Sequence, residues 1–72
     1  MAPNVQTKLE QLLRGELKYT SDNLGLNMLI TRLQKKVAED SDCMGECVHE
    51  LEEFAGKYPT LVSADFDKIA AL

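Results

Sequence analysis

The stretch AEDSDCMGECVHELEEF, residues 38–54, decides how this chain folds, because it fits either a metal-binding loop or the start of a helix. Its apolar residues recur at the spacing of one face of an α-helix. This stripe, which Phe54 flanks, consists of Met44, Cys47, Val48, Leu51, Ala55 and Tyr58. We therefore predict one helix over residues 42–58, which ends where Pro59 disfavours helical geometry at the preceding residue.

A calcium loop is the first alternative, because Asp40, Asp42 and Gly45 match the beginning of an EF-hand loop. Counted from Asp40, the fifth position is Met44, which offers no hard oxygen ligand. The twelfth position is Leu51, where calcium requires a bidentate Glu. Because Met44 and Leu51 also belong to the helical stripe, we predict no metal site. The two aspartates then lie at a helix N-terminus, where acidic groups are favourable.

The two cysteines and the only histidine raise the question of a thiol or zinc site. On a helix, Cys43 and Cys47 are neighbours, whereas His49 is rotated by roughly 200° from Cys47. The three side chains then cannot share an ion, and zinc needs a fourth ligand. We predict no metal and no cofactor, a buried Cys47 and a partly exposed Cys43. Since a helix N-terminus can activate a thiol, Cys43 is the candidate reactive thiol, and a redox or metal-responsive switch at Cys43/Cys47 is an alternative function.

Two segments before this stretch also have helical periodicity. In residues 4–17, Asn4 is a plausible N-cap, and Gly15 either ends the helix or lies within one that runs on to Tyr19. The face of this first helix consists of Val5, Leu9, Leu12 and Leu13. The second helix has the clearest stripe, formed by Leu26, Leu29, Ile30, Leu33 and Val37. Its cap is one of three turn formers, Ser21, Asp22 or Asn23.

The predicted fold is all-α, a small bundle of three main helices plus a short C-terminal helix, in a single helical domain over residues 1–72. Ser63 is a candidate N-cap for the last helix, and we expect the second and third helices to form an antiparallel hairpin. We find no convincing strand alternation. The predicted core consists of Leu9, Leu12, Leu13, Leu26, Leu29, Ile30, Leu33, Val37, Met44, Cys47, Val48, Leu51 and Phe54, with Phe66 and Ile69 as its lid.

The length and the net charge of the chain limit the classes of function that it can have. A chain of 72 residues can bury only a small core, which a second copy, a metal or a disulfide often supplements. No apolar run is long enough for a membrane span, and the first residues do not resemble a secretory signal. We therefore expect a cytoplasmic protein with no membrane partner. The net charge of −4 disfavours nucleic acid, although a nucleic-acid-binding regulator using Arg32/Lys35/Lys36 is kept as a further alternative.

Two large apolar residues do not fit the amphipathic pattern. Leu24 and Met28 point roughly 160–200° away from the core stripe of the second helix. Either another segment of the chain covers them, or they form a protein-interaction surface. His49 lies among glutamates on a polar face with no nucleophile beside it in sequence, so we expect no enzyme. The leading hypothesis is a small acidic interaction or regulatory module that binds another protein or a second copy of itself.

Overall fold

The computed structural model of this chain describes residues 3–72. The prediction of an all-α fold is confirmed, because every regular element in this range is helical. The elements are α1 (Pro3–Leu13), α2 (Leu24–Glu39), the 3₁₀ turn η1 (Ser41–Cys43), α3 (Met44–Lys57) and α4 (Pro59–Ala70). The C-terminal helix α4 has 12 residues and α1 has 11.

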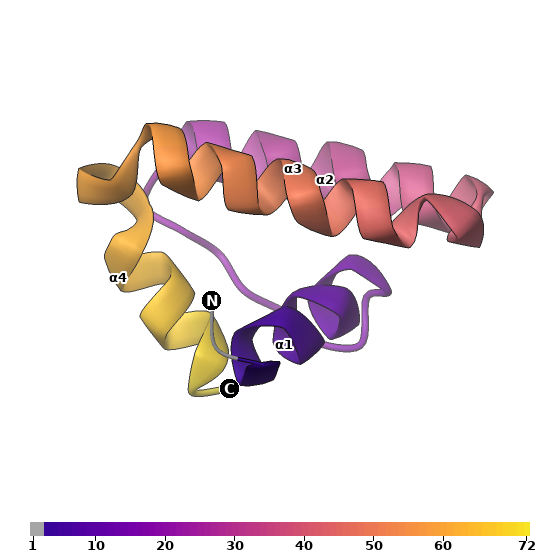
Figure 1. Cartoon of the computed structure of the whole chain (residues 1–72), viewed down its shortest axis with the longest axis horizontal. Helices are drawn as coiled ribbons and strands as arrows, with labels where there is room; N and C mark the ends of the chain where they lie inside the picture. Colours follow the sequence, from indigo (N-terminus) through magenta and orange to yellow (C-terminus); the bar gives the residue numbers. More distant parts are fainter. Residues whose placement is uncertain (1–2) are drawn as a thin grey trace.

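The helices form two pairs. Figure 1 shows α2 and α3 side by side and antiparallel, as the sequence predicted, with α1 and α4 beneath them. The two outer helices also contact each other, although they lie at opposite ends of the described chain. The Lys8 ammonium on α1 donates a hydrogen bond to the Leu72 carbonyl, 2.5 Å away, just beyond α4. The core therefore lies between a central hairpin and a pair of helices remote in sequence.

Both prolines start helices, which corrects two predicted caps. α1 begins at Pro3, so Asn4 lies inside the helix rather than at its cap. α4 begins at Pro59, so Ser63 also lies within a helix, one turn after its start. Proline suits the first helical position because its φ is preset and its missing N–H has no partner there. Tyr58, whose φ of −129° and ψ of 55° are not helical, separates α3 from α4, and α3 ends before Pro59 as predicted.

A glycine in the left-handed region ends α1. Gly15 has φ +81° and donates its N–H to the Leu12 carbonyl at 3.1 Å. The next N–H, from Glu16, reaches back to the Gln11 carbonyl at 2.9 Å. These two bonds form a Schellman motif, which satisfies carbonyls left unpaired at a helix end. Of the two predicted alternatives, the one that ends the helix at this glycine is confirmed, and extension to Tyr19 was wrong.

One of the three candidate residues caps the N-terminus of α2. The Asn23 side chain accepts from the Leu26 N–H at 3.1 Å and is the N-cap. Buried Ser21 supports this cap, because its hydroxyl accepts from the Asn23 N–H at 2.8 Å. The Asn27 side chain then holds the backbone of Ser21 through two hydrogen bonds, of 2.8 and 2.7 Å. The loop before α2 is therefore fixed by its own polar side chains.

The core agrees with most of the sequence stripes. Its buried apolar residues are Leu9, Leu12, Leu13, Leu26, Ile30, Leu33, Val37, Cys43, Cys47, Val48, Leu51, Val62, Phe66 and Ile69. Three predicted core residues, Leu29, Met44 and Phe54, are only half-buried and pack around its edge. Val62 was missed because the early start of α4 adds a turn that the sequence had assigned to a loop.

A buried polar pair joins the loop after α1 to α4. The Tyr19 hydroxyl donates a hydrogen bond to Asp65, whose side chain is buried. Burial and the hydrogen bond to this carboxylate raise the pKa of Tyr19 to about 12, because the phenolate would have to lie beside another negative charge. The phenol therefore stays protonated and keeps donating at neutral pH.

We expect Gly15→Ala to lower the free energy of unfolding by about 1 kcal/mol, because an L side chain is disfavoured at positive φ. Gly56→Ala is the matched control within α3, where an added Cβ meets no atom within 4 Å. It should be neutral or stabilise by up to about 1 kcal/mol, since alanine has the higher helix propensity. Urea unfolding curves measure both changes. Equal effects of the two substitutions would contradict the assigned helix end.

We expect Tyr19→Phe to destabilise the protein by about 1–3 kcal/mol, because it leaves the buried Asp65 carboxylate without its donor. The folded phenol has a pKa of about 12 against about 10 when unfolded, so its contribution is complete below pH 10 and is lost as the pH rises towards 12. Ultraviolet titration of Tyr58→Phe, which leaves one tyrosine, measures this pKa. A normal phenol titration in that variant would refute the bond.

Candidate functional site

The outer face of α2 carries the most exposed large apolar side chains of the described chain. Leu24 is 71% exposed and Met28 is 64% exposed. Neither α1 nor the loop after it covers them, so the alternative of an internal cover is wrong. The two residues line a shallow groove of about 590 Å³ together with Asn27, Thr31, Arg32 and Lys35. We call this groove the α2 groove.

Basic residues of α2 lie on different sides of the helix. The Arg32 guanidinium donates to the Glu50 carboxylate on α3 at 2.8 Å, and the Lys36 ammonium lies 3.9 Å from the same carboxylate. Lys35 instead lines the α2 groove. Of the Arg32/Lys35/Lys36 cluster, Arg32 both pairs with Glu50 and lines the groove, Lys36 only approaches Glu50, and Lys35 only lines the groove. Since exposed ion pairs contribute only about 0–1 kcal/mol, this arrangement orients the helices more than it stabilises them.

The two thiols lie together under the α2–α3 joint. The Sγ atoms of Cys43, in η1, and Cys47, in α3, are 3.4 Å apart, and both cysteines are free. The expected partial exposure of Cys43 was wrong: it is only 8% exposed, because the 3₁₀ turn directs it inwards. Burial, together with the neighbouring Cys43 thiol, raises the pKa of Cys47 to about 11. Cys47 is therefore a protonated thiol, and a poor nucleophile, at neutral pH.

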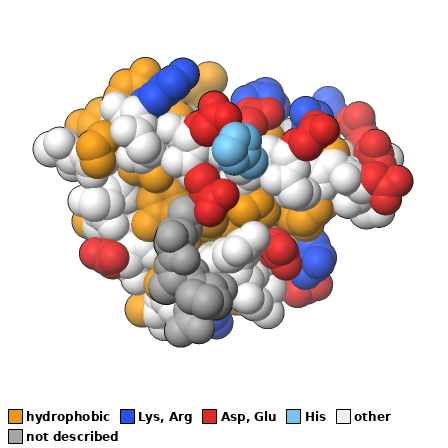
Figure 2. Space-filling model, in the orientation of Figure 1, with side chains coloured by type: hydrophobic (Ala, Val, Ile, Leu, Met, Phe, Trp, Pro, Cys, Tyr) orange, Lys and Arg blue, Asp and Glu red, His pale blue; other side chains and the backbone are white. Residues whose placement is uncertain are grey.

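The histidine lies away from the thiols, on the acidic face of α3. Its Nε2 is 2.7 Å from a carboxylate oxygen of Glu53, one turn further along the helix, and both side chains are exposed. Figure 2 shows this single histidine, in pale blue, surrounded by acidic side chains. Within residues 3–72 no group of three or more His, Cys, Asp or Glu side chains is placed to hold a metal ion, and His49 is exposed whereas both cysteines are buried.

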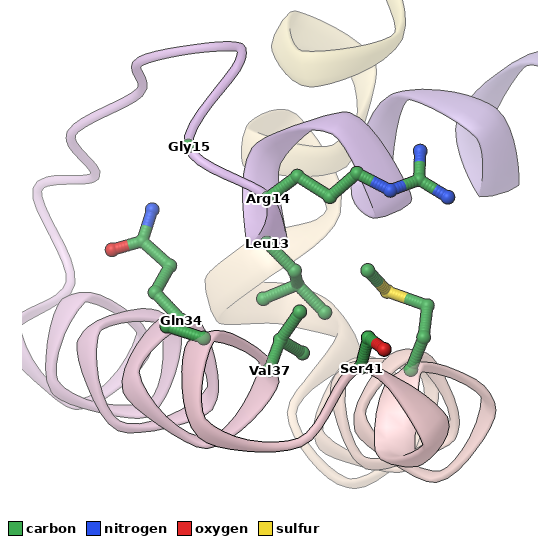
Figure 3. Close-up of a pocket in the computed structure, with 8 residues that line it drawn as sticks. Leu13, Arg14, Gly15, Gln34, Val37 and Ser41 are labelled. Carbon is green, nitrogen blue, oxygen red and sulfur yellow. The ribbon is translucent and has the colours of Figure 1, made fainter.

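A second hollow, which no sequence pattern indicated, lies where the end of α1 meets the end of α2. It has a volume of about 530 Å³ and an apolar floor in which Leu13 and Val37 meet. In Figure 3 the Arg14 side chain extends along one side of it, and Ser41 lies at its edge. Gln34 beside it is held by a 3.0 Å hydrogen bond from its amide to the Leu12 carbonyl. Its residues come from segments far apart in sequence, so no local motif could indicate it.

Comparison with protein-family models, with curated proteins and with solved structures gives no match to this chain. None of the helices in residues 3–72 combines the length and the apolarity that crossing a bilayer demands. Function must therefore be argued from the surface itself, and the α2 groove is its strongest candidate site.

We expect both thiols of the native protein to react with a disulfide reagent at least tenfold more slowly than those of the urea-unfolded chain, since both are buried and thiolates are the reactive species. The same measurement on the variants Cys43→Ser and Cys47→Ser assigns each reaction rate to one of the two thiols. Raising the pH towards 11 should accelerate Cys47, provided that the fold persists. Native Cys43 reacting faster than a free thiol would instead support a thiol switch.

Proposed function

We propose that this chain is a small protein-interaction module without catalytic activity, which binds another protein or a second copy of itself through the α2 groove. The observation that carries the proposal is the exposure of Leu24 and Met28, one turn apart on a single helix face. Single exposed leucines are common, but two large side chains lining one groove form a continuous apolar surface. Methionine adapts its shape to irregular partners, which suits such a surface.

The rest of α2 supports this role because it holds the groove rigid. The opposite face of the helix carries four buried residues, Leu26, Ile30, Leu33 and Val37. Its N-terminus is fixed by the Asn23 cap and its C-terminal half by ion pairs to Glu50. A surface on a rigid helix loses little conformational entropy when a partner binds.

A thiol switch at Cys43 and Cys47 remains the second candidate, because their sulfur atoms are only 3.4 Å apart. An oxidant such as a peroxide would have to take two electrons and two protons from the pair to close a disulfide. The burial of both thiols opposes that reaction, since a peroxide must first reach a thiolate. The α2 groove is therefore the better supported site.

The test is the native mass of the protein isolated from its own cells, compared between wild type and the double variant Leu24→Glu/Met28→Glu. We expect the wild type to be isolated in complex with a partner or a second copy, and the variant to be isolated without it. Burying each side chain is worth about 1.5–3 kcal/mol, so the double change should weaken binding by at least a hundredfold.

Leu61→Glu is the matched control, because Leu61 lies on α4 and is 60% exposed. It introduces the same chemistry on another helix and should leave the complex intact. Circular dichroism should show the same helix content in all variants. Isolation of the wild type as a lone monomer, or loss of the complex in Leu61→Glu, would contradict the proposal.

A further inference from the structure

We propose that Cys43 and Cys47 form a chelating site for trivalent arsenic, which both thiols bind together as an uncharged product. The site lies under the α2–α3 joint, and none of the residues that line the α2 groove belongs to it. The inference therefore goes beyond the proposed interaction function and does not depend on it. It follows from the number of sulfur ligands, from their spacing and from the charges around them.

The local backbone places the two sulfur atoms side by side. Cys43 ends η1 and, with a φ of −85° and a ψ of 5°, precedes α3 rather than lying within it. Cys47 follows one turn later, inside α3. Their Sγ atoms are 3.4 Å apart, and both thiols are free. The fold therefore holds two soft ligand atoms in contact before anything binds to them.

The number and spacing of these sulfur atoms favour a bridging atom that forms two bonds at about a right angle. A disulfide would require the sulfur atoms to approach to about 2.05 Å, and it also requires an oxidant. Zinc requires four ligands, whereas residues 3–72 contain no group of even three metal-binding side chains. Copper(I) held in a line between two thiolates requires sulfur atoms farther apart than the observed 3.4 Å. Trivalent arsenic is pyramidal, so two sulfur atoms bonded to it lie close to their observed separation.

The charges around the thiols suit an uncharged ligand. The charged side chains that act on Cys47 are Lys36 on α2 and Glu50 on α3, and their ammonium and carboxylate groups lie 3.9 Å apart. Their opposite charges offset each other, so the site attracts neither a cation nor an anion. A copper(I) ion with two thiolates carries a net negative charge, which is costly to bury. Arsenous acid is uncharged, and so is its product with two thiols.

Binding is a condensation that changes no oxidation state. Arsenous acid carries three hydroxyl groups on arsenic, and two of them leave as water, each with one thiol proton. Two arsenic–sulfur bonds form, one hydroxyl group stays, and arsenic remains trivalent. Because the hydroxyl groups take up both protons, no thiolate has to be stable in the buried site. Cys43 is 8% exposed and Cys47 is fully buried, so Cys43 reacts first and Cys47 then closes the chelate.

The test adds sodium arsenite to the reduced, purified protein and follows its native mass, its thiol content and its thermal unfolding. The wild type should bind one arsenic per chain and lose both titratable thiols together. Its melting temperature should rise, since a ligand that binds the folded state more tightly than the unfolded chain stabilises the fold. Cys43→Ser and Cys47→Ser should each bind at least about a hundredfold more weakly, because the second bond of a chelate forms within one molecule.

Cys43→Ser/Ala55→Cys is the matched control, because it keeps two thiols but places them about two turns apart on α3, at half-buried Ala55 and at Cys47. It should bind arsenic as weakly as Cys43→Ser. Zinc at the same concentration should leave the melting temperature of the wild type unchanged, since two thiols supply only half of its ligands.

The inference is overturned by a wild type that binds no arsenic, or that binds it no more tightly than the matched control. A melting temperature that falls with arsenite would also overturn it, because arsenic would then bind the unfolded chain instead of a site in the fold. A rise caused by zinc that requires both cysteines would refute the choice of arsenic. None of these results involves Leu24 or Met28, so the proposed interaction function is tested independently.

Discussion

The packing of α2 against α3 is the contact on which the rest of this structure depends. Leu33 on α2 and Leu51 on α3 are fully buried, and their helices bring the oppositely charged Arg32 and Glu50 together at the surface. Neither α1 nor α4 has an apolar face wide enough to form a core alone, so both pack onto the hairpin and onto each other. Since burial of apolar area is the main favourable term in folding, a small chain depends on this first shared surface.

The helical stripes made much of this fold predictable, because apolar residues that recur on one face of a helix pack against a core. The end of α1 was predicted only as one of two alternatives, and the one in which Gly15 ends the helix is correct because glycine can adopt the backbone that a helix end requires. The start of α4 was not predicted. Pro59 indicates the end of one helix, but proline is equally suited to begin the next, and here it starts α4, which buries Val62.

The sequence indicated two residues of the α2 groove but did not show whether they are exposed. Leu24 and Met28 stood out because they broke the pattern of α2, but whether another segment covers them depends on tertiary packing. The inward position of Cys43 depends on a 3₁₀ turn at the joint, which a single α-helical wheel cannot represent. The hollow beside Arg14 gave no local signal, because two helix ends create it jointly. The spacing of apolar residues thus predicts where the helices lie. Cavities, and whether a residue is covered by another segment, depend on how the helices pack together.

The contact between α1 and α4 has a consequence for how the chain acquires its structure during synthesis. α1 is synthesised before α4, and because it packs against α4 as well as α2 and α3, its packing is complete only when α4 is present. Until α4 has emerged, part of the apolar face of α1 stays uncovered, and chaperones can bind exposed apolar surface of this kind. Because this contact joins two helices that lie far apart in sequence, α1 can complete its packing only after α4 has been synthesised and released.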